Sequence, residues 1–359
     1  MNKTSKWIVA LIIIGILVWV IKSSNKSSSP ATQGQVIKIG VVAPLTGGAA
    51  GYGLPLIKGI ELAKRDLGST TNTYEIVFED DGTNPAQSAS AAQKLVNVDK
   101  VSAVITTTSG TGNAVKPIAT VAGIPHICIC VDTTMTDNKT NFMYLALPEV
   151  EAEAWANEAA SRGVKNIALI GQNHPGFNVI VDKIKPFFVE KGIKIVFEEK
   201  FDPTVKDFKT VIAKARASKP DLYFVGAFPP SLDVIGSELK TQGIKNVAGI
   251  GTFAISANPS LFNGDWFTDV NLTDGAFKER FVKEFPEVRF NARTAPEGYD
   301  AFNLLVKALE SGQSPGAYIA GLTSYEGKVG RVTKPADKGN FSVSVGIWKI
   351  ENGEAVQVK

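Results

Sequence analysis

The residue types best suited to chemistry alternate along one short segment, at His126, Cys128, Cys130 and Asp132. In a β-strand every second side chain points to the same face, so this spacing places all four on one side. Imidazole and thiolate groups bind zinc, which makes a metal site one interpretation. However, same-face neighbours on a strand lie about 6–7 Å apart, too far for several consecutive ones to share an ion. We therefore interpret His126 and Cys128 as core residues.

The last two residues of this segment are expected to lie in a different environment from the first two. Cys130 and Asp132 fall where the strand pattern stops, so we expect them to be exposed to a cleft. The strand spacing argues against a disulfide between Cys128 and Cys130, because a disulfide demands a specific, short separation of the two residues.

A second candidate site is the run TTTSGTG at 106–112, which follows an apolar strand pattern and precedes a helix expected from about Asn113. Hydroxyl groups and free backbone N–H groups at a helix start bind carboxylates well. Ser109, Gly110 and Thr111 are therefore candidates to hold an anionic group. Threonine capping of the helix is the alternative explanation for the same residues.

A third candidate is the glycine-rich run TGGAAGYG at 46–53, again between a strand and a helix pattern. A helix start could bind a phosphate or carboxylate here. The spacing is not G-x-G-x-x-G and no Walker lysine follows, so the run favours a tight turn over a dinucleotide site. Tyr52, a large aromatic residue between glycines, either borders a ligand or packs within the loop.

A catalytic constellation is missing from the sequence. His174 follows a strand pattern, but no Gly-x-Ser-x-Gly elbow accompanies it. The acid pairs at 80–81 and 198–199 are adjacent, so on an extended backbone their side chains face opposite ways. With only two histidines and two cysteines, a His-rich metalloenzyme and a disulfide scaffold are both disfavoured. We expect no enzyme activity, no metal and no cofactor.

Composition narrows the function classes further. The chain has 359 residues, of which 44% are hydrophobic and 20% charged, which suits a globular protein of two or three domains. Four of the 38 basic residues lie among the first thirty residues, which hold no acid, so the remainder carries 34 basic against 35 acidic residues. A nearly neutral body argues against nucleic acid as a partner.

The first thirty residues are predicted to be a targeting or anchoring segment. An uncharged run of 15 residues at 7–21 lies between Lys6 and Lys22, and a serine-rich stretch follows it. The run suits a signal peptide, but no clear cleavage site follows, so an uncleaved signal anchor is the other interpretation. No cysteine is present there for lipid attachment. Either interpretation takes the body across a membrane, with residues 31–35 as a flexible tether.

The body alternates between strand and helix patterns. The strand patterns are expected at 36–43, 74–79, 101–106, 124–130, 166–170, 194–201, 222–225, 247–250 and 341–350. The helical patterns are expected at 56–67, from 85, and at 113–121, 177–190, 207–217, 231–241, 273–285 and 296–311. Such alternation predicts an α/β protein with parallel sheets covered by helices on both faces. A break near Pro148 divides it into two doubly wound lobes, whose ligands belong beyond the carboxyl ends of the strands.

Several short motifs of the chain, taken in order, resemble those of a known protein family. They are KIGVVAPLTG at 38–47, Tyr52-Gly53, GIELA at 59–63, FEDDGTNP at 78–85, the strand at 101–105 with Ser109, GIP at 123–125, Gly226 with Phe228, YDA at 299–301 and GNF at 339–341. Together they resemble the type I periplasmic solute-binding proteins of ABC transporters, of the leucine/isoleucine/valine-binding family. The resemblance covers residues 36–358.

This resemblance implies two Rossmann-like lobes joined by three crossovers, near 147–149, 267–270 and 333–339, that close on a small ligand. Residues 36–148 with 270–335 would form the first lobe, and 149–269 with 336–359 the second.

The resemblance also implies roles for single residues. Ser109 and the amides of Gly110 and Thr111 would hold a ligand carboxylate, while Cys130 and Asp132 match the positions that hold an ammonium group. Tyr52 and Phe228 would form aromatic walls.

The sequence departs from the family pattern at two places. Pro175-Gly176 stands where the family often has Tyr-Gly, and Phe177 could replace that aromatic wall. Thr252 follows a strand where amino-acid binders often carry an acid, so Asp132 would have to supply the negative charge.

We therefore expect an extracytoplasmic solute-binding protein, tethered to the membrane by residues 7–21, that delivers an amino acid or a related amide or carboxylate to the membrane permease of an ABC transporter. A ligand-sensing receptor module of the same fold is the alternative.

Overall fold

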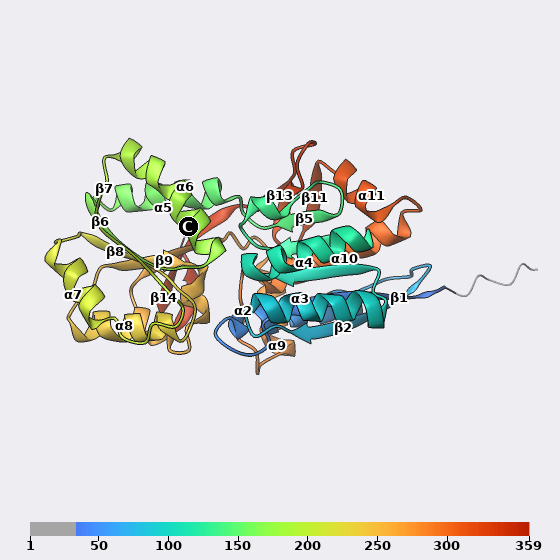
Figure 1. The fold of residues 1–359 in the computed structure, drawn as a ribbon, viewed down its shortest axis with the longest axis horizontal. Helices are drawn as coiled ribbons and strands as arrows, with labels where there is room; N and C mark the ends of the chain where they lie inside the picture. The colour runs from blue at the N-terminus through green and yellow to red at the C-terminus, as the bar shows by residue number, and fades with distance from the viewer. Residues whose placement is uncertain (1–33, 359) are drawn as a thin grey trace, which may run out of the picture.

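The computed structural model describes residues 34–358 as two α/β lobes that lie side by side (Figure 1). The expected anchor at 7–21 and tether lie outside the described residues. Among the helices within 34–358, none is both long and apolar enough to cross a membrane.

The first lobe is built on a sheet of six parallel strands in the order β13-β5-β4-β3-β1-β2. Its strands are β1 (Val36–Ala43), β2 (Thr73–Asp80), β3 (Ala103–Thr107), β4 (His126–Ile129), β5 (Asn141–Tyr144) and β13 (Asn340–Phe341). Its helices are α2 (Ala50–Arg65), α3 (Pro85–Lys94), α4 (Ser109–Ala122), α9 (Gly275–Glu284), α10 (Ala295–Glu310) and α11 (Pro315–Gly321), with short helices η1 (Leu95–Asp99) and η2 (Thr133–Met135). A separate antiparallel pair joins β11 (Ser324–Gly327) to β12 (Gly330–Thr333).

The second lobe is built on a seven-stranded sheet in the order β15-β14-β10-β9-β8-β6-β7. Its strands are β6 (Asn166–Gln172), β7 (Lys194–Phe201), β8 (Leu222–Gly226), β9 (Val247–Ile250), β10 (Trp266–Val270), β14 (Val345–Glu351) and β15 (Glu354–Gln357). Its helices are α5 (Pro148–Ser161), α6 (Pro175–Lys191), α7 (Lys209–Ala217) and α8 (Ser231–Thr241), with 3₁₀ turns η3 (Gly251–Ile255) and η4 (Pro259–Phe262). Only β14 and β15 run antiparallel to their neighbours in this sheet.

The burial of the strands follows from their place in the sheets. All five residues of β3 and of β8 are buried, as expected for central strands that are covered by helices on both faces. The edge strands β2 and β7 are largely half-exposed. The predicted α/β class with two doubly wound lobes is therefore confirmed.

Two helices of the first lobe begin earlier than their apolar patterns indicate. The glycine-rich run forms the first turn of α2, which places Tyr52 on a helix instead of in a loop. The hydroxyl run forms the first turn of α4, because the side chain of Thr108 caps it by accepting from the backbone N–H of Thr111 at 3.3 Å.

The chain passes from the first sheet to the second for the last time at a later residue than the sequence predicts. Residues 336–359 were assigned to the second lobe, but β13 pairs in parallel with β5 of the first sheet. The pattern at 341–350 was interpreted as one strand. It is two, and the chain passes from one sheet to the other between Phe341 and Val345.

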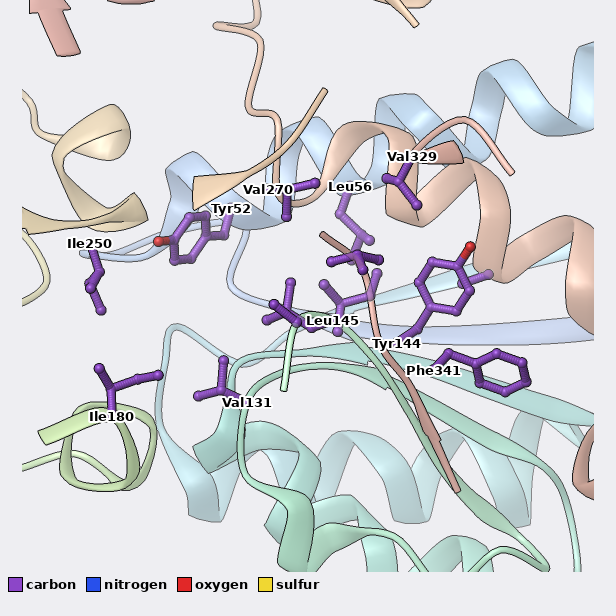
Figure 2. Packing of buried hydrophobic residues seen from close by; sticks show 14 of the residues in the cluster. Tyr52, Leu56, Val131, Tyr144, Leu145, Ile180, Ile250, Val270, Val329 and Phe341 are labelled. Carbon is purple, nitrogen blue, oxygen red and sulfur yellow. The ribbon is translucent and has the colours of Figure 1, made fainter. Parts of the chain in front are cut away.

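Apolar packing continues across the boundary of the lobes. Tyr52, Val131 and Leu145 of the first lobe belong to the same buried cluster as Ile180 and Ile250 of the second (Figure 2). The backbones also approach closely there: a Cβ atom added at Gly51 would lie 2.6 Å from Cβ of Ile255. The structure is therefore that of a closed two-lobed protein.

Candidate ligand-binding site

A cavity of about 50 Å³ lies between the two lobes, which leaves room for a few water-sized groups. The first lobe lines it with Tyr52, Thr107, Thr108, Ser109, Ile129, Cys130, Val131, Leu145 and Arg293. The second lobe lines it with Glu151, His174, Gly176, Phe177, Ile180, Phe228, Ile250 and Thr252. The lining combines an apolar majority with a few polar side chains, as small-molecule sites do.

Six of the nine residues expected to contact a ligand line this cavity: Tyr52, Ser109, Cys130, Phe177, Phe228 and Thr252. They come from the carboxyl ends of strands or from the helices that follow, as the strand-end rule predicts. Gly110, Thr111 and Asp132 are not among the lining residues.

Thr111 is occupied within its own lobe. Its hydroxyl donates to Oδ2 of Asp81 at 2.5 Å and lies 3.0 Å from the hydroxyl of Thr108. Ser109 is the hydroxyl residue of this turn that faces the second lobe, because a Cβ atom at Gly176 would lie 3.2 Å from its Oγ. The first turn of α4 therefore presents the Ser109 hydroxyl at a helix N-terminus, where anions are favoured.

His174 stands across the cavity from this turn, at the N-cap of α6. Its Nδ1 accepts from the backbone N–H of Gly176 at 3.2 Å, and burial lowers its pKa to about 4. The ring is therefore neutral at pH 7 with its proton on Nε2. That nitrogen points toward α4, since a Cβ atom at Gly110 would lie 3.2 Å from it. His174 thus adds an N–H donor near Ser109.

Three aromatic side chains and the His174 ring form one wall. Phe228 packs against Tyr52, Phe177 and His174, with ring-centroid separations of 6.1, 4.9 and 5.1 Å. Phe177, predicted to replace an aromatic wall, lines the cavity beside Phe228. Such edge-to-face and tilted contacts are the favourable arrangements of aromatic rings.

A buried ionic cluster also borders the cavity. Arg293, which precedes α10 in the first lobe, donates from Nη2 to Oε1 of Glu151 and from Nε to Oδ1 of Asp269, each at 2.9 Å. Glu151 and Asp269 belong to the second lobe and are 0% and 1% exposed. Thr268 also donates to Oε1 of Glu151, at 3.1 Å. Burial raises the pKa of Asp269, and the neighbouring guanidinium opposes that effect.

Several oxygen atoms around this cluster have no partner among the described residues. Oε2 of Glu151, Oγ1 of Thr252 and both carboxyl oxygens of Glu297 are buried without a hydrogen bond. Burial raises the pKa of Glu297 well above its usual range, which favours the protonated form of this side chain.

Asp132 does not fit the role expected from the sequence. Its Oδ2 accepts from Nδ2 of Asn113 at 2.8 Å, and its Oδ1 accepts from the backbone N–H and the hydroxyl of Thr134 at 3.0 and 2.7 Å. The carboxylate therefore caps the short helix η2, and no part of Asp132 lines the cavity. The side chain expected to bind a ligand ammonium group is instead hydrogen-bonded to residues of the first lobe.

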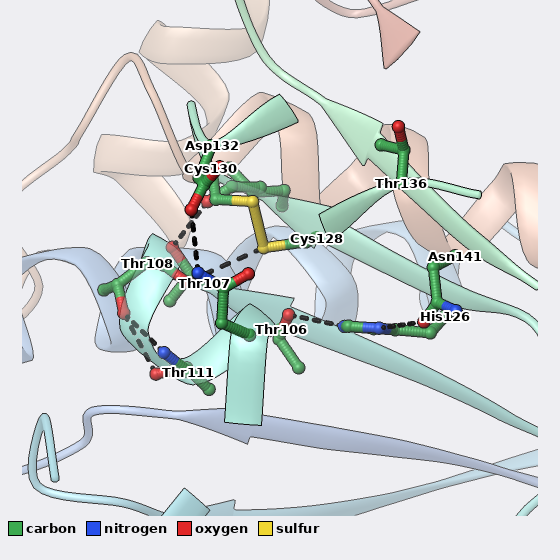
Figure 3. Close-up of a disulfide and its surroundings, with 12 residues drawn as sticks. Thr106, Thr107, Thr108, Thr111, His126, Cys128, Cys130, Asp132, Thr136 and Asn141 are labelled. Carbon is green, nitrogen blue, oxygen red and sulfur yellow. Dashed lines mark hydrogen bonds between the residues drawn. A yellow bond between two sulfur atoms is a disulfide. The ribbon is translucent and has the colours of Figure 1, made fainter. Parts of the chain in front are cut away.

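The two cysteines form a disulfide, contrary to our expectation (Figure 3). The Cα atoms of Cys128 and Cys130 are 5.4 Å apart, within the range that a disulfide bridges. β4 ends at Ile129, so the full strand spacing assumed for this pair does not extend to Cys130. His126 is a core residue as predicted: its ring nitrogens contact Thr106 at 2.8 Å and Asn141 at 3.0 Å. Residues 34–358 contain no cluster of three or more His, Cys, Asp or Glu that could hold a metal ion.

Sequence reasoning missed Arg293 and Glu151. Glu151 lies in the first turn of α5, and Arg293 lies in the irregular segment before α10. Neither follows directly on a strand, so the strand-end rule does not point to them. Their pairing across 142 positions has no local signal in a single sequence.

The sequence model of a family described as "Periplasmic binding protein" matches residues 36–338, which is most of the chain. This chain belongs to the periplasmic binding protein family. The match begins at β1 and runs through both lobes, so it includes every element that lines the cavity.

Relatives of this periplasmic binding protein are distant. It is 24% identical over 246 residues to the Leu/Ile/Val-binding protein BraC3 of Rhizobium johnstonii, an alignment covering 66% of this chain and 63% of that protein. The chain thus spans less than two thirds of that relative's length. The leucine binding protein LivK from Thermotoga maritima shares its fold, with a TM-score of 0.81 and 19% identity over 90% of this chain and 98% of the other. LivJ from Streptococcus pneumoniae, in complex with isoleucine, gives a TM-score of 0.79 and 21% identity over 90% and 100%.

Proposed function

We propose that the protein is an extracytoplasmic solute-binding protein that closes on a small ligand and delivers it to the membrane permease of an ABC transporter. The observation that carries the proposal is the cavity between two lobes, lined from both sides by strand-end residues. Its family membership and the names of its relatives as Leu/Ile/Val-binding proteins support the same role. We expect this site to bind its ligand without turnover, in keeping with the membership of the chain in a family of binding proteins.

The ligand class we propose is an amino acid or a related amide or carboxylate. Ser109 and the backbone N–H groups at the start of α4 offer a carboxylate or carbonyl two or more hydrogen bonds, each worth about 1.5–3 kcal/mol when one partner is charged. Phe177, Phe228 and Tyr52 leave apolar contact for the remainder of the ligand. The small cavity favours a compact molecule.

Closure is the second part of the proposal. Lobe-to-lobe contacts, such as Gly51 with Ile255, exist only when the lobes are together, and a ligand that touches both lobes stabilises this state over an open one.

We also propose that residues 7–21 keep the protein at the outer face of a membrane. The lysine-flanked apolar run supports this. The described chain begins at the end of the first lobe that is remote from the cleft, so a tether there would leave the cleft free (Figure 1).

A thermal-shift screen across amino acids, amides, urea and small carboxylates tests the function. A ligand present at one hundred times its Kd adds about 2.7 kcal/mol to the free energy of unfolding, which is a clear shift. Stabilisation by at least one compound, with no chemical change in that compound, is expected. A flat response across the whole set would contradict the proposed ligand class.

A further inference from the structure

Two residues that line the cavity from the second lobe each have a buried side-chain oxygen without a hydrogen-bond partner among the described residues. These oxygens are Oε2 of Glu151 and Oγ1 of Thr252, and their residues are 0% and 1% exposed. Buried polar atoms are hydrogen-bonded in the great majority of cases, so two unpaired acceptors in residues that line one cavity point to a partner bound there.

The two residues lie against the same ionic cluster. Gly251, which precedes Thr252, is so close to it that an added Cβ atom would lie 2.8 Å from Oδ2 of Asp269 and 2.8 Å from Nε of Arg293. Arg293 in turn holds Glu151. The chain therefore brings Thr252 and Glu151 to the same end of the cavity from η3 and α5.

The orientation of Glu151 is fixed. Its Oε1 is occupied by Nη2 of Arg293 at 2.9 Å and by the hydroxyl of Thr268 at 3.1 Å, which leaves only Oε2 free to accept. The guanidinium of Arg293 also donates to Asp269, so two carboxylates share a single positive charge. A group that brings N–H donors suits this end far better than a second carboxylate does.

We infer that Glu151 and Thr252 form an acceptor subsite for an N–H group of the ligand, from either an amine or an amide nitrogen. This inference rests on the proposed function and adds a second polar end to its ligand. Donors at Ser109 and His174 hold the carboxylate or carbonyl, and acceptors at Glu151 and Thr252 hold the nitrogen. Thr252 has no carboxylate, and Glu151 of α5 supplies one to the same subsite.

The test compares matched ligands by isothermal titration: alanine, propionate and propionamide, and leucine, 4-methylpentanoate and 4-methylpentanamide. The wild-type protein is expected to bind a nitrogen-bearing member of at least one set about tenfold or more tighter than the acid that lacks nitrogen. Thr252→Val removes the hydroxyl at nearly constant volume, and Glu151→Gln removes the charge. Each should abolish most of that preference while changing the binding of the nitrogen-free acid by less than about twofold.

Asp132→Asn is the matched control, because this acid is near the cavity but outside its lining. It should leave the preference unchanged. Equal wild-type affinity for the acid and its nitrogen-bearing analogues would overturn the inference and leave the proposed function standing. So would a Thr252→Val variant, folded by its melting curve, that retains the full preference. Failure of all six compounds to bind would instead contradict the proposed ligand class, and the inference with it.

Discussion

Arg293 and Glu151 form an ion pair across the boundary of the lobes, with 2.9 Å between Nη2 and Oε1. The two side chains are 9% and 1% exposed, so water screens them little. The pair links the segment before α10 to the first turn of α5, and both of its residues line the cavity. It therefore contributes both to the contact between lobes and to the polarity of the cavity.

Removal of this arginine is expected to be costly. Arg293→Met leaves Glu151 and Asp269 buried without their cation, which should lower the free energy of unfolding by about 3–5 kcal/mol at pH 7. Without the guanidinium, burial raises the pKa of Asp269 further in the folded state. The deficit should therefore shrink as the pH falls toward about 4, where Asp269 becomes protonated in the folded and the unfolded state alike. Urea unfolding at several pH values measures this.

The control for that variant is Arg331→Met, since Arg331 is 68% exposed and its contact with Glu326 is 3.6 Å long. Its unfolding free energy should change by less than about 0.5 kcal/mol. Equal losses of unfolding free energy in the two variants would show that the buried ion pair contributes no more to stability than an exposed one.

Glu297 predicts a pH dependence of stability. Burial raises the pKa of Glu297 in the folded protein. The contribution of this side chain to the free energy of unfolding is therefore fully present below the ordinary glutamate pKa, and it is lost as the pH rises toward the pKa of the folded state. Glu297→Gln, which does not ionise, should therefore gain stability relative to the wild type between pH 5 and pH 8. Urea unfolding across this range measures the difference. A difference that is constant with pH would mean that Glu297 is ionised in the folded state.

Gly48 tests the closed contact between lobes. A Cβ atom at this position would overlap the carbonyl oxygen of Pro229 in the second lobe. Gly48→Ala should therefore destabilise the closed state and weaken the affinity for a ligand by about tenfold or more, with little change in the circular dichroism of the free protein. Gly68→Ala is the control, because nothing lies within 4 Å of its Cβ position. Unchanged affinity in Gly48→Ala would place the ligand in an open cleft.

The N-terminal segment predicts membrane retention. If the apolar run at 7–21 anchors the chain as proposed, the full-length protein should sediment with membranes after expression, whereas a variant that begins at Ala31 should stay in the supernatant. Recovery of the full-length-encoded protein with a new N-terminus between Ser24 and Thr32 would show cleavage instead of anchoring.

Alternating strand and helix patterns were enough to predict both lobes, because buried parallel strands leave continuous apolar runs such as that of β3. β13 escaped prediction because a two-residue strand has no period, and its apolar residue merges with the pattern of β14. The disulfide was missed because Cys130 lies just beyond the end of β4, where strand geometry no longer sets the separation.

The site was predictable only in part, for a similar reason. Residues that follow directly on strands, such as Ser109 and Thr252, are found from the strand pattern. Arg293 reaches the cavity through the close packing of α10 on α2, where Gly298 and Gly59 let the backbones approach, and this is a property of the tertiary structure. Asp132 was assigned to the ligand because a strand end was identified, but its neighbours Asn113 and Thr134 satisfy it locally.

Small-angle X-ray scattering of the soluble variant from Ala31 tests the central claim that the protein closes on its ligand. The radius of gyration should fall when the strongest ligand from the thermal-shift screen is added at saturation, and the curve should then match the closed arrangement of residues 34–358. Saturation is verified by titration on the same sample. An unchanged radius with the ligand fully bound would contradict closure as the mechanism of binding.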